Sequence, residues 1–287
     1  MKFLVIGDIE EAEYLNALLN IDLKSYPFMV LTGDIAGLPT GWKIGRARAL
    51  EDKNFIPPNK DPKEYYQELL EPNVEKLRKI DNILKKINRY LKVFAVYGNT
   101  DFKSVVERAK PTSFDVIHNK LVEINGFYLA GYNGHPMYPW EIENPLKKDI
   151  FGYTYEETAL ELNSFKEENI YHDLKSLTES YPNDRIIIVT HTPPYRILDK
   201  VKPELIEWAR KSYGEKSKDG NVGSTGLRNF ILEYKPILSL FGHIHESVGI
   251  EKVDGTTCVN AGKFDENKEI VEIRLERKEV KAKFISV

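Results

Sequence analysis

Short apolar runs recur along the chain, and each ends in small or polar residues. Five of them are rich in Val, Ile, Leu and Phe and do not alternate with polar residues: 3–6, 28–31, 93–96, 186–189 and 237–241. Runs of this kind are typical of strands that are buried on both faces. A Gly, Asp, Asn or His cluster follows each run, so we expect polar side chains at the carboxyl end of each strand.

Helical periodicity fills the segments between several of these runs. From Val74 to Leu91, apolar residues recur at spacings of three and four over about five turns. Pro62 predicts the start of this helix, because proline fits the first helical position. Thr154, with a glutamate three residues later, predicts a capped helix that runs towards Leu177.

The alternation of strands and helices predicts a layered α/β fold with a mostly parallel sheet. The end of the chain differs, because four segments read as strands joined by short turns: 247–250, 256–259, 269–275 and 280–285. These predict a second, more antiparallel sheet. We expect a single domain over residues 1–287, since α/β folds of this length commonly form one domain.

Three long connections, near residues 38–72, 131–153 and 194–223, carry Gly, Pro and aromatic residues. Long loops in a compact domain are usually functional or disordered. Each follows a strand that delivers, or could deliver, a polar cluster. We therefore expect these insertions at the rim of a functional site, as lids or substrate walls.

The five polar clusters predict a metal centre. Sites in open α/β sheets form at the carboxyl ends of strands, so two carboxylates, an amide oxygen and three imidazoles should converge there. The residues are Asp8, Asp34, Asn99, His191, His243 and His245. Oxygen and imidazole ligands suit Mn, Fe, Zn or Ni better than metals that prefer thiolates. A lone Gly-Asp pair is most often a turn and a lone histidine most often structural, so the ordered set carries the prediction.

Two divalent cations about 3.5–4 Å apart repel each other, so one carboxylate is expected to bridge them. A water held between them would lose a proton near neutral pH. The resulting hydroxide would attack a phosphate ester whose oxygens the metals hold. Two divalent metal ions are therefore the expected cofactors.

Composition limits the classes of partner and the cellular location that we expect. A net charge of −3 argues against a general nucleic-acid binder. The single cysteine, Cys258, excludes an intrachain disulfide and favours a cytoplasmic protein. Neither a signal peptide nor a membrane span is expected from the apolar runs. No Gly-x-Ser-x-Gly or Gly-x-x-x-x-Gly-Lys motif appears, and composition does not predict an oligomeric state.

The ordered clusters resemble the calcineurin-like metallophosphoesterase superfamily. Its signature runs Asp-x-His, Gly-Asp-x-x-Gly, Gly-Asn-His, His and Gly-His-x-His, and the match spans Asp8 to His245. Residues 259–262 look like the late Val-Asn-Pro-Gly turn, and residues 191–195 are similar to an uncharacterised prokaryotic subgroup of predicted phosphoesterases. The resemblance implies a four-layer α-β-β-α sandwich of two mixed sheets, with a di-metal site at the strand C-terminal edge.

The resemblance also implies two sets of metal ligands. The first set is Asp8, His245 and the bridging Asp34. The second set is Asp34, Asn99, His191 and His243, where the His243 position is sometimes bound through its backbone. We expect Asp34, Asn99 and His191 to belong to the catalytic centre.

Two residues depart from the superfamily pattern. Glu10 stands in place of the histidine of Asp-x-His; it could bind metal directly, bind through water or miss the metal. As a ligand it would favour harder ions such as Mn²⁺ or Fe²⁺. Thr100 stands where many members have a histidine that is the candidate acid for the leaving alkoxide, and threonine is a poor acid.

Without that histidine, another group serves, the substrates carry a good leaving group, or the enzyme is slow. Asp101 is one candidate replacement, although a carboxylate there could instead orient nearby ligands. His135, at the tip of an expected rim loop, is the other, and it could contact the substrate or the leaving group.

The sequence thus predicts a metal-dependent phosphoesterase that acts on a small-molecule or nucleotide phosphate mono- or diester. The alternative is a catalytically weak or inactive metal-bearing scaffold for protein interactions, because Glu10 and Thr100 could be early erosion of the site. Six of the seven ligand positions keep the expected residue, which favours the enzyme. A nuclease would need a basic channel, for which the net charge gives no support.

Overall fold

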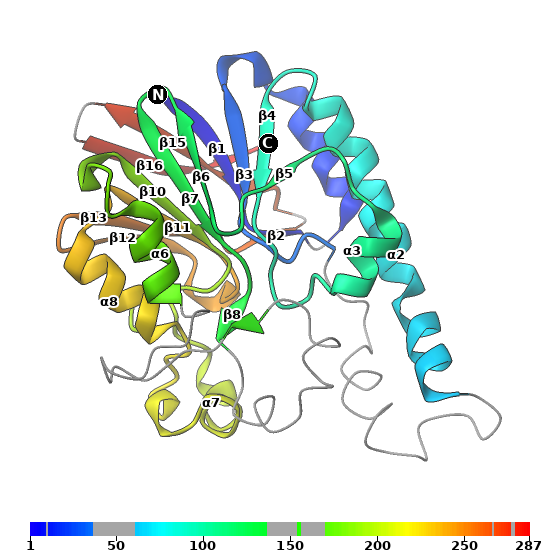
Figure 1. Ribbon diagram of the computed structural model, residues 1–287. Coiled ribbons are helices and arrows are strands. Elements are labelled where there is room, and N and C mark those ends of the chain that lie inside the picture. Colours follow the sequence, from blue (N-terminus) through cyan, green and yellow to red (C-terminus); the bar gives the residue numbers. More distant parts are fainter. Residues whose placement is uncertain (10, 37–60, 137–153, 156–169, 266, 277–278) are drawn as a thin grey trace.

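The computed structural model describes residues 1–9, 11–36, 61–136, 154–155, 170–265, 267–276 and 279–287. Two six-stranded mixed sheets form its centre (Figure 1). The strand order is β16-β15-β1-β3-β4-β5 in the first sheet and β12-β13-β11-β10-β7-β6 in the second. The α/β class and the two mixed sheets are therefore confirmed.

Parallel strands occupy the middle of both sheets. The first sheet contains β1 (Lys2–Ile6), β3 (Phe28–Leu31), β4 (Lys92–Ala95), β5 (Asp115–Val116), β15 (Glu269–Glu276) and β16 (Glu279–Ser286). The second contains β6 (Lys120–Ile124), β7 (Phe127–Tyr132), β10 (Ile186–Thr190), β11 (Leu238–Phe241), β12 (Gly249–Val253) and β13 (Thr256–Asn260). The pairs β1–β3–β4–β5 and β7–β10–β11–β13 are parallel, and the remaining pairs are antiparallel.

The strands at the end of the chain do not form a sheet of their own, so that expectation was wrong. β13 pairs with β11 in the second sheet, whereas β15 pairs with β1 in the first. The β1–β15 pairing joins segments from opposite ends of the sequence, and the short turns between the strands carry no signal for either pairing.

Helices cover the outer faces of both sheets. Beside the first sheet lie α2 (Pro62–Ile87), α3 (Lys103–Ala109) and the 3-10 segments η1 (Ala12–Asn20) and η2 (Leu23–Ser25). Beside the second lie α6 (Ile170–Thr178) and α8 (Thr225–Tyr234) (Figure 1). None of the described helices combines the length and apolar character that a bilayer crossing requires.

Helix boundaries were only partly predictable. The start of α2 at Pro62 is confirmed. The helix start at Thr154 is wrong, because β9 (Thr154–Tyr155) is a strand that pairs with β8 (His135–Pro136). The helix expected to run towards Leu177 is confirmed at that end by α6 (Ile170–Thr178). A long-range pairing thus overrides the local capping pattern.

All three expected rim insertions contain regular structure. Residues 62–72 of the first belong to α2, and the second contains the end of β7 and β8 (His135–Pro136). The third contains η4 (Pro203–Leu205), α7 (Ile206–Tyr213) and η5 (Glu215–Ser217). Residues 37–60 and 137–153 lie outside the described residues.

Three apolar cores explain why the strands read as unbroken apolar runs. In β1, Leu4 and Ile6 pack on the helical side, while Phe3 and Val5 pack between the sheets. The Phe3 and Phe28 rings stack there with their centroids 4.4 Å apart. In β10, alternate residues likewise belong to the inter-sheet core and to the core beneath α6 and α8. The three cores therefore lie between helices and the first sheet, between the two sheets, and between the second sheet and its helices.

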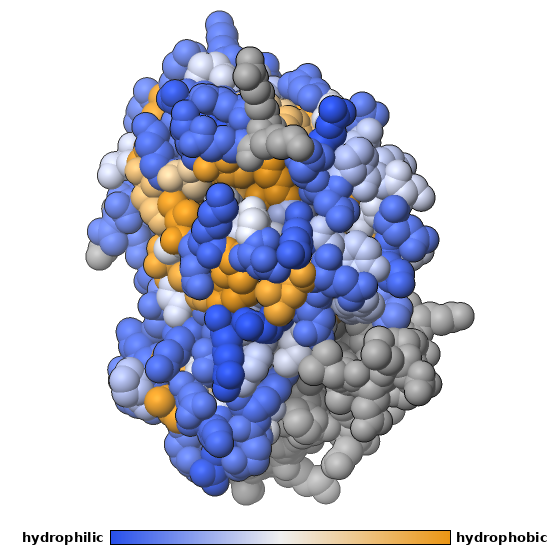
Figure 2. All heavy atoms as spheres, turned by 90° about the vertical axis from the view of Figure 1, so that its left-hand side faces the viewer, coloured by the Kyte–Doolittle hydropathy of each residue, from blue (hydrophilic) through white to orange (hydrophobic). Residues whose placement is uncertain are grey.

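β16 is the outermost strand of the first sheet. Its Val280, Ala282 and Phe284 side chains are half-buried at the border of the inter-sheet core, while Lys281 and Lys283 are exposed between them. Figure 2 views this side of the molecule and shows hydrophobic surface between hydrophilic residues. Lysines on an edge strand oppose pairing with another sheet.

Candidate metal centre

The strand ends of both sheets bring the predicted ligands together. Asp8, Asp34 and Asn99 follow β1, β3 and β4 of the first sheet, and His191 and His243 follow β10 and β11 of the second. Within each sheet these strands are parallel, so their carboxyl ends share one edge. The two sheets thus supply one site jointly.

His191 lies at the centre of the site and is fully buried. Its Nδ1 lies 3.0 Å from the Thr32 carbonyl oxygen, and since a carbonyl only accepts, Nδ1 donates a proton to it. Its Nε2 faces Asn99 Oδ1 at 2.9 Å and Asp34 Oδ1 at 3.5 Å. In neutral His191, three acceptor atoms therefore face one another, which favours a cation between them.

These spacings fit a metal ion. Ligand atoms about 2.1 Å from one ion lie roughly 3.0–3.4 Å apart. The ligand atoms of Asp34, His191 and His243 all lie within 4.8 Å of one another. Imidazole, carboxylate and amide donors suit the borderline and harder divalent ions, so the residues present fit the implied metals.

Asp8 and His245 form the second part of the site. His245 Nε2 lies 2.6 Å from Asp8 Oδ2, and the backbone N–H of His243 donates to Asp8 Oδ1 at 3.2 Å. Burial lowers the pKa of His245, but the Asp8 carboxylate outweighs this and raises it to about 9. A metal ion that binds His245 must therefore displace a proton at neutral pH.

Burial disfavours the charged form of the neighbouring ligands. Burial raises the pKa of Asp34, and the charge of Asp8 raises it further. Burial also lowers the pKa of His243 well below its ordinary value, as do the imidazoles around it. A divalent cation would compensate the carboxylate charge and coordinate the neutral imidazole.

Two glycines leave the space that the carboxylates occupy. A Cβ at Gly98 would lie 2.1 Å from Asp34 Oδ1, and a Cβ at Gly242 would lie 2.6 Å from Asp8 Oδ1. Asp34 and His243 themselves adopt left-handed backbone conformations, with φ of 48° and 69°. Such conformations are unfavourable for ordinary residues and concentrate at functional sites.

Asp101 contacts the backbone of two ligand-bearing turns. Its Oδ1 accepts the N–H groups of Ile35 and Ala36, at 2.9 and 3.2 Å, and its Oδ2 accepts that of Gly98 at 2.8 Å. Both carboxylate oxygens are therefore engaged. These contacts favour a positioning role for Asp101 over transfer of a proton to a leaving group.

Thr100 contributes its backbone to the site. The Thr100 N–H donates to Asp34 Oδ1 at 2.8 Å, which helps to orient the predicted bridging carboxylate.

His135 is fully buried and lies in β8, so the expected position at the tip of a rim loop is wrong. Its ring stacks on that of His243, with centroids 5.6 Å apart and an interplanar angle of 8°. The preceding residues hold it there, because Asn133 Oδ1 accepts the Tyr97 N–H and Gly134 N–H donates to the Tyr97 carbonyl. Contact between His135 and the substrate or leaving group, and with it a catalytic role, stays a prediction.

Glu10, the remaining predicted ligand, lies outside the described residues. Tyr213 was not predicted, yet its hydroxyl lies 3.5 Å from His243 Nε2. It belongs to no motif, and only its place within the 194–223 insertion hinted at the site.

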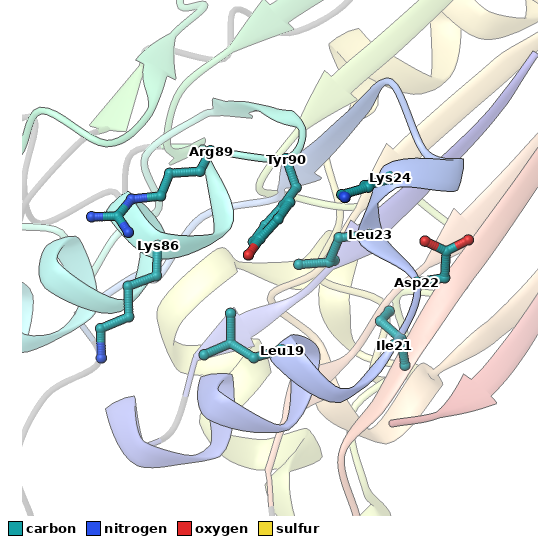
Figure 3. A pocket seen from close by; sticks show the side chains of 8 residues that line it. All are labelled: Leu19, Ile21, Asp22, Leu23, Lys24, Lys86, Arg89 and Tyr90. Atoms are coloured by element: carbon teal, nitrogen blue, oxygen red, sulfur yellow. The ribbon is translucent and has the colours of Figure 1, made fainter.

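A separate surface hollow of about 460 Å³ lies between η2 and the end of α2. Lys86 and Arg89 lie on one side of Tyr90, and Lys24 and Leu23 lie on the other (Figure 3). These residues precede β3 and β4, whereas Asp34 and Asn99 follow the same strands. The hollow is therefore at the opposite end of the sheet from the candidate metal centre.

Sequence comparison finds matches for most of the chain. The model of the calcineurin-like phosphoesterase family matches residues 1–247. Uncharacterized protein MJ1162 of Methanocaldococcus jannaschii is 26% identical over 179 residues, which cover 62% of this chain and 66% of that protein. UPF0046 protein K07C11.7 of Caenorhabditis elegans is 28% identical over 102 residues, which cover 36% and 30%. The chain thus spans less than two thirds of each of these curated relatives.

Structural comparison finds a dimetal phosphatase from Danio rerio, with a TM-score of 0.58 and 11% identity. The similarity covers 99% of this chain and 95% of that one. At this identity, the likeness shows a shared fold.

Proposed function

The chain belongs to the calcineurin-like phosphoesterase family, and from this premise we propose that it hydrolyses a phosphate mono- or diester at a centre of two divalent metal ions. Family membership supports metal-dependent phosphoester hydrolysis in general. One observation carries the proposal: Asn99 Oδ1 and Asp34 Oδ1 lie 2.9 and 3.5 Å from His191 Nε2, so three potential metal-ligand atoms converge.

The ligands divide into two sets. Asp8, His245 and Asp34 would hold one ion. Asp34, Asn99, His191 and His243 would hold the other. Mn, Fe, Zn and Ni all suit these donors. When bound, the two cations would supply a bridging hydroxide as nucleophile and neutralise charge that develops on the phosphate oxygens.

The chain's own residues orient these groups. Thr32 fixes the tautomer of His191, so Nε2 presents its lone pair to the site. Thr100 holds Asp34 through its backbone but offers only a hydroxyl, which is a poor acid at neutral pH. We therefore expect turnover to rise steeply as the leaving group becomes more acidic.

The substrate is proposed to be a small phosphoester rather than nucleic acid, because the net charge of −3 supplies no general attraction to polyanions. The rival function is a metal-bearing scaffold without turnover. The same experiment separates the two functions.

The test measures hydrolysis of p-nitrophenyl phosphate and bis(p-nitrophenyl) phosphate by the purified protein with Mn²⁺. Asp34→Asn keeps the side-chain shape but removes the charge, and should reduce turnover to background. Asp81→Asn is the matched control, because Asp81 is also buried and accepts backbone N–H groups, from Thr112 and Ser113. Mn²⁺ binding without turnover of either ester would reject the enzyme and support the scaffold.

A further inference from the structure

Helix α7 (Ile206–Tyr213) belongs to the third long connection and reaches the candidate metal centre. Its last residue, Tyr213, is 6% exposed, and the hydroxyl lies 3.5 Å from His243 Nε2. A phenol at this position can donate a hydrogen bond to a ligand held at the centre.

A small apolar core fixes α7 against the turn that carries two predicted ligands. Tyr213 and Ala209 pack with Val201, Val222 and Ile244. Ile244 is the residue between His243 and His245, so α7 and both histidines share one packing unit.

Hydrogen bonds attach the rest of the connection. Asn260 Nδ2 donates to the carbonyls of Leu198, at 3.0 Å, and Ile244, at 2.9 Å. The Tyr195 hydroxyl donates to the Lys216 carbonyl at 2.6 Å. The position of Tyr213 is therefore defined by contacts on both sides of α7.

Trp208 lies beside Tyr213 on the same helix. The two ring centroids are 6.0 Å apart, with an interplanar angle of 83°. Trp208 is nevertheless 49% exposed, although an indole that served only packing would gain from deeper burial. An open indole beside a site can stack a flat aromatic group of a ligand.

We propose that the substrate carries a flat aromatic group, as a nucleobase does, which stacks on Trp208 while Tyr213 donates a hydrogen bond to a phosphate oxygen. This inference names the substrate class for the proposed phosphoesterase, and its phosphate half rests on that function. Its aromatic half rests on the exposed indole and on the fixed position of α7.

The test compares two ligands that differ only in the base. Adenosine 5′-monophosphate and ribose 5-phosphate are titrated into the Mn²⁺-loaded protein by calorimetry, and tryptophan fluorescence is followed in parallel. Stacking on an aromatic side chain should favour the adenine ligand by at least about fivefold. Trp208→Ala should abolish this preference and the fluorescence change that accompanies it.

Two further variants isolate the effect. Leu205→Ala removes another exposed apolar side chain, 36% exposed, from the same connection and should keep the preference. Tyr213→Phe should weaken both ligands by a similar factor and leave their ratio unchanged. If thermal unfolding shows that Trp208→Ala is not folded, Trp208→Leu replaces it.

Equal binding of the two ligands by the wild-type protein would overturn the inference, as would a preference that survives in Trp208→Ala, or no binding of either ligand. Phosphate release is measured separately. A protein with the Trp208-dependent preference that hydrolyses no phosphoester would refute the proposed function and keep the aromatic inference. A protein that releases phosphate from both ligands but binds them equally well would do the reverse.

Discussion

Replacing Asp101 with asparagine should weaken metal binding although Asp101 is not a predicted ligand. The carboxylate is 1% exposed and accepts three backbone N–H groups, those of Ile35, Ala36 and Gly98. Two of them follow Asp34 and the third precedes Asn99. One side chain thus holds two ligand-bearing turns together.

The magnitude follows from what asparagine can accept. Its single amide oxygen can accept either the Ile35 and Ala36 N–H groups or the Gly98 N–H group. Its NH₂ group would then face the remaining backbone donor or donors, to which it cannot hydrogen-bond. Loss of one hydrogen bond to a charged group costs about 1.5–3 kcal/mol. Burial raises the pKa of Asp101 to about 7, with the Asp34 charge adding to it, so removing the charge offsets part of that loss. Substitution of a residue that orients ligands typically lowers metal affinity about 10–100-fold.

The assay is Mn²⁺ titration by calorimetry, with thermal unfolding in the presence of a chelator. Asp81→Asn again serves as the control, because Asp81 accepts the backbone N–H groups of Thr112 and Ser113, both at 2.8 Å, away from the ligands. It should lower stability and leave Mn²⁺ affinity unchanged. Wild-type affinity in Asp101→Asn, or an equal loss of affinity in Asp81→Asn, would refute the positioning role.

Gly98→Ala should abolish Mn²⁺ binding in calorimetry, because the added Cβ would lie 2.1 Å from Asp34 Oδ1. Gly249→Ala is the control and should bind Mn²⁺ normally, because its Cβ would meet only a Leu198 methyl at 3.4 Å. In metal-free protein, the stability that Asp101 and Asp34 contribute at about pH 4 should be lost as pH rises to about 7, because burial raises the pKa of Asp101 to about 7 and raises that of Asp34. Added Mn²⁺ should therefore raise the melting temperature more at pH 8 than at pH 5, and an equal rise at both would contradict this. The stability that Glu272 contributes has the opposite pH dependence. Burial raises the pKa of Glu272, but hydrogen bonds from Tyr26 and Lys2 outweigh this and lower it to about 2. Its contribution is thus present above about pH 4.5 and lost as pH falls towards 2, so the loss of stability measured by denaturant unfolding over this range should be smaller in Glu272→Gln than in the wild type.

The parts of the fold that the sequence predicted are those that local chemistry determines. Residues 3–6 and 186–189 read as strands because alternate residues of each enter two different cores. The turns after these strands must hold polar side chains next to glycine, and this leaves a visible pattern. Asp8, Asp34, Asn99, His191, His243 and His245 were therefore found from their places at strand ends, and the structure brings them together, although their roles as ligands stay a prediction.

The parts that the sequence did not predict depend on contacts between distant segments. Thr154 has the local pattern of a helix cap, but it pairs with His135 in a strand. His135 was expected at the tip of a rim loop, but it lies in a strand, fully buried, with its ring stacked on that of His243. No local pattern encodes either contact, because each joins residues that lie far apart in the sequence.

The proposed metal chemistry depends on local turns, whereas the proposed substrate preference depends on contacts between distant segments. The predicted ligands occupy turns of a few residues, so a chain can keep the chemistry by keeping those turns. Tyr213 and Trp208 come instead from a connection whose position depends on packing with Ile244 and on the hydrogen bonds of Asn260. A relative could share all six ligands and present different side chains there. Substrate preference should therefore follow α7 and its anchors, and transfer of a ligand preference between relatives should require both the helix and the residues that hold it.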